Sequence, residues 1–174
     1  MILGIVSDSH DQVGKIFQAV KVFNDRKADL VIHLGDLVSP FTLKCYETLR
    51  CPIKALMGNN QGDILRHFEF AKENGIAIEF FDQIYTIESE GHHIICYHGD
   101  AENILSALLK DDDYDVVLSG HDHVAKIEQI NSKLHINPGT LISDFNLVMK
   151  NSNNYASVAI YNTKNNQAEI IKLT

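Results

Sequence analysis

Acidic, amide and imidazole side chains recur where short apolar runs of this chain end. The first run, Ile2–Val6, is followed by Asp8 and His10, which lie two residues apart and can point the same way in an extended turn. Alone this pair is weak evidence, because Asp and His also fill turns and cap helices. The pattern returns after four later runs, which gives seven candidate ligands: Asp8, His10, Asp36, Asn59, His98, His121 and His123.

These residue types indicate a metal centre. Mixed oxygen and imidazole ligands suit Mn, Fe, Zn, Ni or Co better than Ca or a structural, cysteine-bound Zn. Seven ligands are too many for one catalytic Zn, and they suit two ions about 3.5–4 Å apart that share a bridging carboxylate. Glycines lie beside four of the run ends, at Gly35, Gly58, Gly99 and Gly120.

The apolar runs predict buried parallel strands, since such strands are continuously apolar. Ligands gather beyond the carboxyl ends of parallel strands, so the seven side chains would converge on one rim if their strands share a sheet. We expect helices at 12–26, 40–50, 63–74 and 102–110. We expect strands at 2–6, 30–34, 52–57, 76–81, 85–90, 93–97, 116–119, 124–130, 134–137, 156–162 and 168–173. This βαβαβα pattern with a β-rich second half predicts an α/β sandwich, with a mobile loop at 144–154.

Composition narrows the class of protein. With 174 residues, 45% of them hydrophobic and 22% charged, we expect a single domain over residues 1–174. The net charge of −8 argues against a general nucleic-acid or membrane surface but not against a phosphate substrate, because bound cations invert the local field. Cys45, Cys51 and Cys96 have no metal-binding spacing, so we expect reduced thiols and a cytoplasmic location. No run resembles a signal peptide or a transmembrane helix, and a homo-oligomer stays open.

Several other polar residues have simpler structural interpretations. We expect His33 and His135 to be hydrogen-bonded within the sheets, and His67 to be a surface or half-buried side chain. His92 and His93 are expected in solvent, as are Asp111–Asp113. Asp11 suits a helix cap, and 137–139 would support the site without touching metal.

In the order and spacing of these motifs, the chain resembles the calcineurin-like metallophosphoesterases, most closely their small single-domain phosphodiesterase branch in bacteria and archaea. The resemblance implies a four-layer αββα sandwich of two mixed β-sheets flanked by helices, and it covers most of the chain. The segments that carry it are Ser7-Asp8-Ser9-His10-Asp11, Gly35-Asp36, Gly58-Asn59-Asn60, Tyr97-His98-Gly99, Gly120-His121-Asp122-His123 and Ile136-Asn137-Pro138-Gly139-Thr140.

The resemblance also implies a division of the ligands between two divalent transition-metal ions per chain, Mn²⁺ or Ni²⁺ before Fe, Co or Zn. Asp36 would bridge the ions, since a carboxylate has two oxygens. One ion would be held by Asp8, His10, Asp36 and His123, and the other by Asp36, Asn59, His98 and His121.

The sequence departs from the wider family at Asn60 and Gln61, where many members have a His that assists the leaving group, followed by an Asp. The small branch often lacks this His, and Gln61 leaves no His–Asp dyad. We take Asp36 and Asn60 as the candidate catalytic positions. Asp122 stands where a Thr is common, either as an acceptor behind the ligands or in solvent.

The implied activity is hydrolysis of phosphate esters, most often small diesters, by a hydroxide that a dinuclear centre activates. The alternative is a non-catalytic or weakly catalytic protein-interaction module on the same fold, like the small retromer subunit. That subunit has an incomplete ligand set, whereas this chain retains all seven candidates. A purely structural metal protein is the third hypothesis, and it is weaker because an amide ligand and a shared carboxylate are typical of open catalytic sites.

Overall fold

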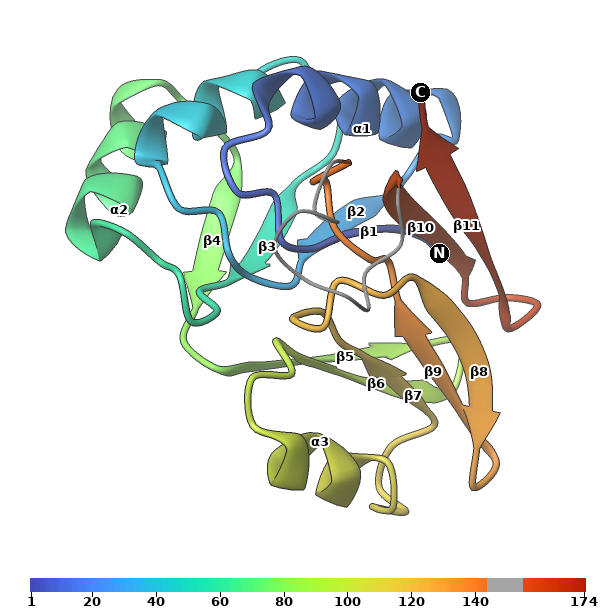
Figure 1. The fold of residues 1–174 in the computed structure, drawn as a ribbon. Helices are drawn as coiled ribbons and strands as arrows, with labels where there is room; N and C mark the ends of the chain where they lie inside the picture. The colour runs from blue at the N-terminus through green and yellow to red at the C-terminus, as the bar shows by residue number, and fades with distance from the viewer. Residues whose placement is uncertain (144–154) are drawn as a thin grey trace.

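The computed structural model describes residues 1–143 and 155–174, and its strands form two mixed sheets (Figure 1). The loop predicted at 144–154 lies outside the described residues. The six-stranded sheet has the order β11-β10-β1-β2-β3-β4, and the five-stranded sheet has the order β5-β6-β7-β9-β8. The strands are β1 (Ile2–Val6), β2 (Leu30–His33), β3 (Ile53–Leu56), β4 (Ile78–Phe81), β5 (Ile84–Ser89), β6 (His92–Tyr97), β7 (Val116–Leu118), β8 (Lys126–Ile130), β9 (Lys133–Asn137), β10 (Ala156–Asn162) and β11 (Gln167–Leu173).

The first sheet is parallel from β1 to β4, and β10 and β11 extend it in antiparallel fashion beyond β1. Its outer face is covered by α1 (Val13–Asp25), α2 (Ile64–Glu73) and the short 3₁₀ helix η1 (Pro40–Tyr46). Helix α1 packs because Ile16, Ala19, Val20 and Phe23 recur at helical spacing and are all buried. The predicted helices 12–26 and 63–74 are thus confirmed to within a residue at each end.

The second sheet pairs β6, β7 and β9 in parallel and carries antiparallel edge strands, β5 and β8. Helix α3 (Glu102–Leu108) lies on its outer side. The hairpin between β5 and β6 turns at Glu90-Gly91, as the sequence predicts. Within the described residues, no helix is both long and apolar enough to cross a membrane.

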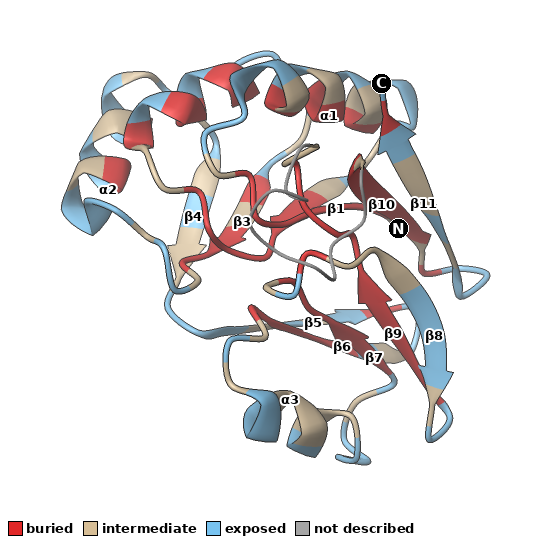
Figure 2. Cartoon of the chain, viewed as in Figure 1, coloured by how far each residue is buried: buried red, intermediate tan, exposed pale blue. Residues whose placement is uncertain are grey.

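Two apolar layers hold the fold together, and Figure 2 shows the buried strands at its centre. One lies between the helices and the first sheet, and the other between the two sheets. Alternation along β1 supplies both layers, because Leu3 and Ile5 belong to the inner cluster and Val6 to the helix-side cluster. The αββα sandwich is therefore confirmed.

One expectation is corrected, and the condition for a single rim of ligands is not met. The segment 40–50 is not an α-helix: η1 ends at Tyr46, and its buried Pro40, Leu43 and Tyr46 are spaced three apart, which matches the three residues per turn of a 3₁₀ helix. The polar strand ends also do not share one sheet. They leave β1, β2 and β3 of one sheet and β6 and β7 of the other, and they meet where the carboxyl edges of both sheets face each other.

Candidate metal centre

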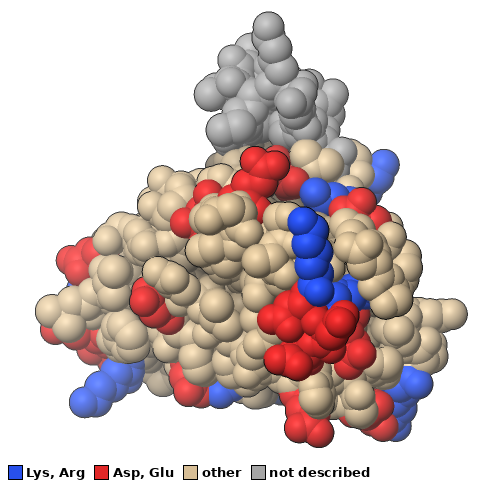
Figure 3. Space-filling model, turned by 90° about the horizontal axis from the view of Figure 1, so that it is seen from below, with Lys and Arg blue, Asp and Glu red and all other residues tan. Residues whose placement is uncertain are grey.

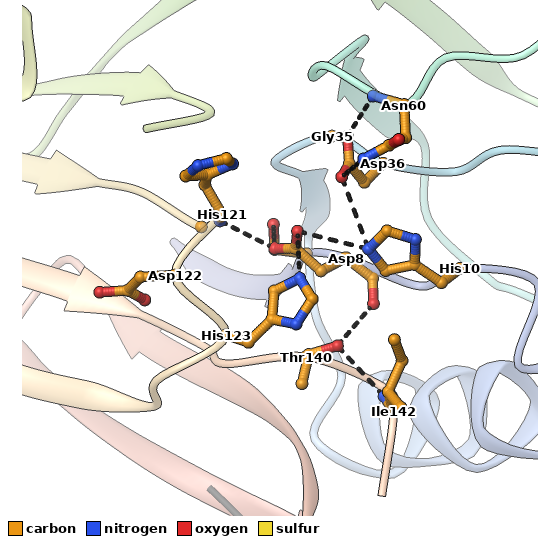
Figure 4. A network of polar contacts seen from close by, with 12 residues as sticks. Asp8, His10, Gly35, Asp36, Asn60, His121, Asp122, His123, Thr140 and Ile142 are labelled. Atoms are coloured by element: carbon orange, nitrogen blue, oxygen red, sulfur yellow. Dashed lines mark hydrogen bonds and ion pairs between the residues drawn. The ribbon is translucent and has the colours of Figure 1, made fainter. Parts of the chain in front are cut away.

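The structure brings all seven predicted ligand positions together at this junction, and Figure 4 shows the part around Asp8 and Asp36. The turn after β1 supplies Asp8 and His10, and the turns after β2 and β3 supply Asp36 and Asn59. The facing sheet supplies the imidazoles that follow β6 and β7. Ligands distant in sequence therefore converge from two layers of the sandwich.

Asp8 is fully buried and stands at the centre of the first group. Its Oδ1 lies 3.1 Å from His123 Nε2 and 3.8 Å from His10 Nε2. Its Oδ2 accepts hydrogen bonds from the Ser7 hydroxyl and, at 2.9 Å, from the backbone N–H of His121. Burial raises the pKa of Asp8, but the neighbouring His10 and His123 rings outweigh this and lower it well below its usual range. Asp8 is therefore an ionised carboxylate, as a candidate metal ligand needs to be.

Asp36 lies between the two groups. Its Oδ2 is 3.5 Å from His10 Nε2, and its Oδ1 is 3.4 Å from His98 Nε2. Asn60 contacts both carboxylate oxygens, since its backbone N–H donates to Oδ1 at 2.8 Å and its side-chain amide donates to Oδ2 at 2.7 Å. The position that holds a His in many family members thus holds an amide that fixes Asp36.

The second group surrounds the amide oxygen of Asn59, which lies 2.8 Å from His98 Nε2 and 2.9 Å from His121 Nδ1. His98 Nδ1 donates to the backbone carbonyl of Leu34 at 2.8 Å, so its Nε2 carries the lone pair when the ring is neutral. This lone pair of His98 Nε2 faces the amide oxygen of Asn59, so two acceptor atoms meet with no proton between them. A cation satisfies both, so these residues fit a metal ion.

The first group fits an ion for a separate reason. His10 Nε2 is buried and has no hydrogen-bond partner among the described residues, although two carboxylates face it. One oxygen of Asp8 and ring nitrogens of His10 and His123 lie within 4.8 Å of one another, and a second cluster within the same limit joins Asp8 to Asp36 and to His98 of the other group. Within the described part of the chain, no Lys or Arg forms an ion pair with either carboxylate. Buried carboxylates at this separation require positive charge, which divalent ions supply.

The backbone at these positions is held in an uncommon conformation. Five of the seven candidates have positive φ angles, between 39° and 67°: Asp8, His10, Asp36, His121 and His123. Such residues cost free energy and persist where the surroundings fix them, often at functional sites. Gly58, at φ 77°, and Gly120 allow the close approach, because a Cβ on either would collide with Asp36 or Ser7, respectively.

The segment after β9 supports the site from behind. Thr140 Oγ1 donates to the backbone carbonyl of Asp8 at 2.8 Å, and Asn137 Nδ2 donates to the carbonyl of Gly120 at 3.0 Å. Asn137 also donates to Asp122 Oδ1 at 2.8 Å, so Asp122 accepts a hydrogen bond behind the ligands while its side chain is partly in solvent. The contact from Thr140 to Asp8 was missed by sequence reasoning, although the Asn-Pro-Gly-Thr segment was a usable signal.

The structure also settles the other polar residues. His33 and His135 are buried and hydrogen-bonded, as expected. His67 was expected to be a surface or half-buried side chain, which is wrong: it is only 1% exposed, because it packs against Phe80 and its Nδ1 hydrogen-bonds to the carbonyl of Asp63 at 2.8 Å.

Asp11 does not cap α1, because its carboxylate accepts instead from the backbone N–H of Ser39 at 2.9 Å. The histidines of the β5–β6 hairpin are partly or fully exposed, as expected, and so is the acidic turn after α3. The three cysteines are unpaired, with Cys45 and Cys96 buried.

A sandwich of two mixed sheets with metal-binding residues on its facing edges defines the metallophosphoesterase class. Residues 1–166 match the calcineurin-like phosphoesterase superfamily domain, and the chain belongs to that family. It is 36% identical over 139 residues to phosphodiesterase MJ0936 of Methanocaldococcus jannaschii, a match that covers 80% of this chain and 83% of that protein. A solved structure described as a novel archaeal phosphodiesterase superimposes with a TM-score of 0.86 at 32% identity, covering 99% of this chain and 100% of that one.

The chain is therefore a hydrolase that acts on phosphoester bonds and that works with divalent metal ions. Vps29 of Entamoeba histolytica, solved with Zn²⁺, superimposes with a TM-score of 0.66 at 16% identity, covering 99% of each chain. That likeness shows the fold alone. The protein-interaction alternative is not favoured, because the family and the relative of higher identity are phosphoesterases.

Proposed function

We propose that this chain is a phosphodiesterase that uses two divalent transition-metal ions. The observation that carries the proposal is the convergence of seven ligand side chains on two adjacent points. Asp8, His10, Asp36 and His123 would hold one ion, and Asp36, Asn59, His98 and His121 the other.

The two ions, when bound, supply Lewis acidity: they activate water as a nucleophile and neutralise charge on the phosphate oxygens. The chain's own residues hold the arrangement. Asp36 presents one oxygen toward each group, and Asn60 keeps that carboxylate in place with its two hydrogen bonds. The carbonyl of Leu34 fixes the ring of His98 so that Nε2 faces the centre. Asn59 contributes an uncharged oxygen, which leaves the loaded centre positive and attractive to a phosphate anion.

Two cavities beside the centre support a diester rather than a monoester. One, of about 640 Å³, includes His121 in its wall, and the other, of about 300 Å³, includes Asn59 and His98. Asp100 lines both cavities. A phosphodiester has two organic arms, and a phosphate held between these ligands has room for one on each side. The similarity of this chain to MJ0936, which is named a phosphodiesterase, also supports a diester substrate.

Oxygen and imidazole donors without thiolate suit Mn, Ni, Fe, Co and Zn alike, and the order that puts Mn²⁺ or Ni²⁺ first comes from the family resemblance. The three unpaired thiols support a reducing, cytoplasmic location.

The test is to chelate the protein, reload it with Mn, Ni, Co, Zn or Mg, and assay a panel of phosphomonoesters and phosphodiesters. We expect two bound ions per chain and faster turnover of diesters. Asp36→Asn should remove most activity and weaken both ions. Asp25→Asn, on the exposed end of α1, is the matched control and should leave both unchanged. Saturation at one ion per chain, or equal losses in the two variants, contradicts the proposal.

A further inference from the structure

The larger cavity beside the centre is a groove on the outer side of the second sheet, between α3 and β8. Its volume is about 640 Å³, which is the size of pocket that holds small organic molecules. Leu105 and Leu109 line one wall, and Ile130 and Glu128 line the other. His121 belongs to the groove and also contacts Asn59 in the centre, so an ester bound at the centre can extend directly into the groove.

The groove carries an excess of negative charge. Its lining includes the carboxylates of Asp100, Glu102, Asp122 and Glu128 against the ammonium groups of Lys110 and Lys126. The charge of Lys126 is already balanced, since its Nζ lies 2.9 Å from Asp122 and 4.0 Å from Glu128. Figure 3, which views the molecule from below, shows acidic side chains gathered on this face, with basic side chains lying against the largest group of them.

Glu128 is an acid of the groove that buried neighbours hold in a defined position. Its Oε1 accepts from His135 Nδ1 at 3.0 Å, and His135 Nε2 accepts from the Ser119 hydroxyl at 2.8 Å. Ser119 and His135 are buried beneath Glu128 and fix its carboxylate through these two hydrogen bonds, while the Glu128 side chain is 42% exposed. This row resembles a Ser–His–acid triad, but the hydroxyl is buried and cannot reach a substrate. The row holds the Glu128 carboxylate in the groove wall, with the second oxygen of that carboxylate available to a ligand.

We propose that the groove between α3 and β8 binds the retained alcohol arm of the phosphodiester and selects an arm that carries a cationic group, with Glu128 as a specificity-determining residue. The inference rests on the proposed function, because it places the reacting phosphate at the centre. The selection follows from charge. A cationic arm offsets the excess of carboxylates, a neutral arm gains nothing from them, and an anionic arm is repelled.

The test keeps one leaving group and varies only the retained arm. The three probes are p-nitrophenyl diesters of choline, of its neutral analogue in which carbon replaces nitrogen, and of a carboxylate-bearing alcohol of similar length. Each unit charge at about 6 Å in water changes binding about threefold, so an excess of two charges favours the cationic over the neutral arm about tenfold in kcat/KM at low salt. The preference should shrink as ionic strength rises, because these groups are exposed to solvent.

Glu128→Gln keeps an oxygen that accepts from His135 and removes the charge, so the preference for the cationic arm should fall about threefold. The matched control is Glu47→Gln, which makes the same change in net charge directly after η1, on the opposite outer face of the sandwich. It should leave the preference and the basal activity unchanged.

A flat or reversed order among the three probes, or equal effects of the two variants, overturns the inference while leaving the phosphodiesterase proposal in place. If no probe is hydrolysed with any metal, the proposed function fails instead. The equilibrium dissociation constants of the same three compounds then decide the groove: tighter binding of the choline ester supports the inference, and equal binding overturns it.

Discussion

Asn60→Ala should weaken metal binding about tenfold. The side-chain amide of Asn60 donates to Asp36 Oδ2 at 2.7 Å, and its backbone N–H donates to Oδ1 at 2.8 Å. Alanine keeps the backbone bond and removes the other. A hydrogen bond to a charged group contributes about 1.5–3 kcal/mol, and because Asn60 is exposed we take the lower value, about 1.5 kcal/mol. That free energy is about tenfold in an equilibrium constant.

The assay is calorimetric titration of the chelated protein with Mn²⁺, together with kcat/KM for an aryl diester at limiting and at saturating metal. Asn60→Ala should lose activity mainly at limiting metal and recover most of it at saturation, because the residue acts through Asp36. Asn103→Ala, at an exposed position of α3, controls for loss of a surface amide and should change neither quantity.

The refuting result is specific. If Asn60→Ala binds Mn²⁺ as tightly as the parent chain while kcat/KM falls at all metal concentrations, then Asn60 acts on the substrate and not on Asp36. If neither quantity changes, the side-chain hydrogen bond from Asn60 to Asp36 has no functional weight.

Three further predictions concern leaving groups, packing and pH. Because the Asn60 amide cannot supply a proton, kcat/KM should fall steeply as leaving-group pKa rises from aryl to alkyl diesters; a flat series, with chemistry rate-limiting, would reveal an unidentified general acid. Gly120→Ala should lower the free energy of unfolding by about 1–3 kcal/mol, since its Cβ would collide with the Ser7 hydroxyl, whereas Gly14→Ala, in α1 with open space, should raise it by about 0.5–1 kcal/mol; thermal unfolding that ranks them otherwise contradicts the packing. Burial lowers the pKa of His33 from 6.5 to about 4, so the stability that the neutral ring contributes is complete above pH 6.5 and is lost as pH falls toward 4, by up to about 3 kcal/mol. Urea unfolding of the chelated protein should show that His33→Gln loses less stability over that pH window than the parent chain. Equal losses would mean that His33 is not buried in its neutral form.

Much of the fold was predictable because its strands are short apolar runs with polar ends. The run Leu30–His33 and the turn at Asp36 illustrate this, since local sequence sets both the buried strand and the place of the ligand. Which sheet a strand joins depends on contacts between distant segments. Periodicity could not show that β6 and β7 belong to a second sheet, so a single rim could be predicted only on the condition that the strands share one sheet.

At the candidate site, too, local features were predictable from the sequence and contacts between distant segments were not. The seven ligand types and their order were readable, since each follows a strand end. Directions were not: Asn60 was a candidate catalytic position that stands where many family members have a His, and the sequence did not show that its amide points at Asp36. His67 has the spacing of a surface position on α2, and only the packing of Phe80 against that helix explains its burial. Such contacts depend on how the layers meet, which periodicity does not contain.

The junction of the two sheets has a consequence for folding kinetics. Asp8 contacts the backbone of His121 across 113 residues of sequence and the ring of His123 across 115. The two proposed ions would not find their full sets of candidate ligands until both sheets have formed and docked, so metal would not serve as an early nucleus. Interactions made after the transition state slow unfolding and leave the folding rate unchanged. Metal binding should therefore slow unfolding and prolong the lifetime of the native state, without speeding its formation.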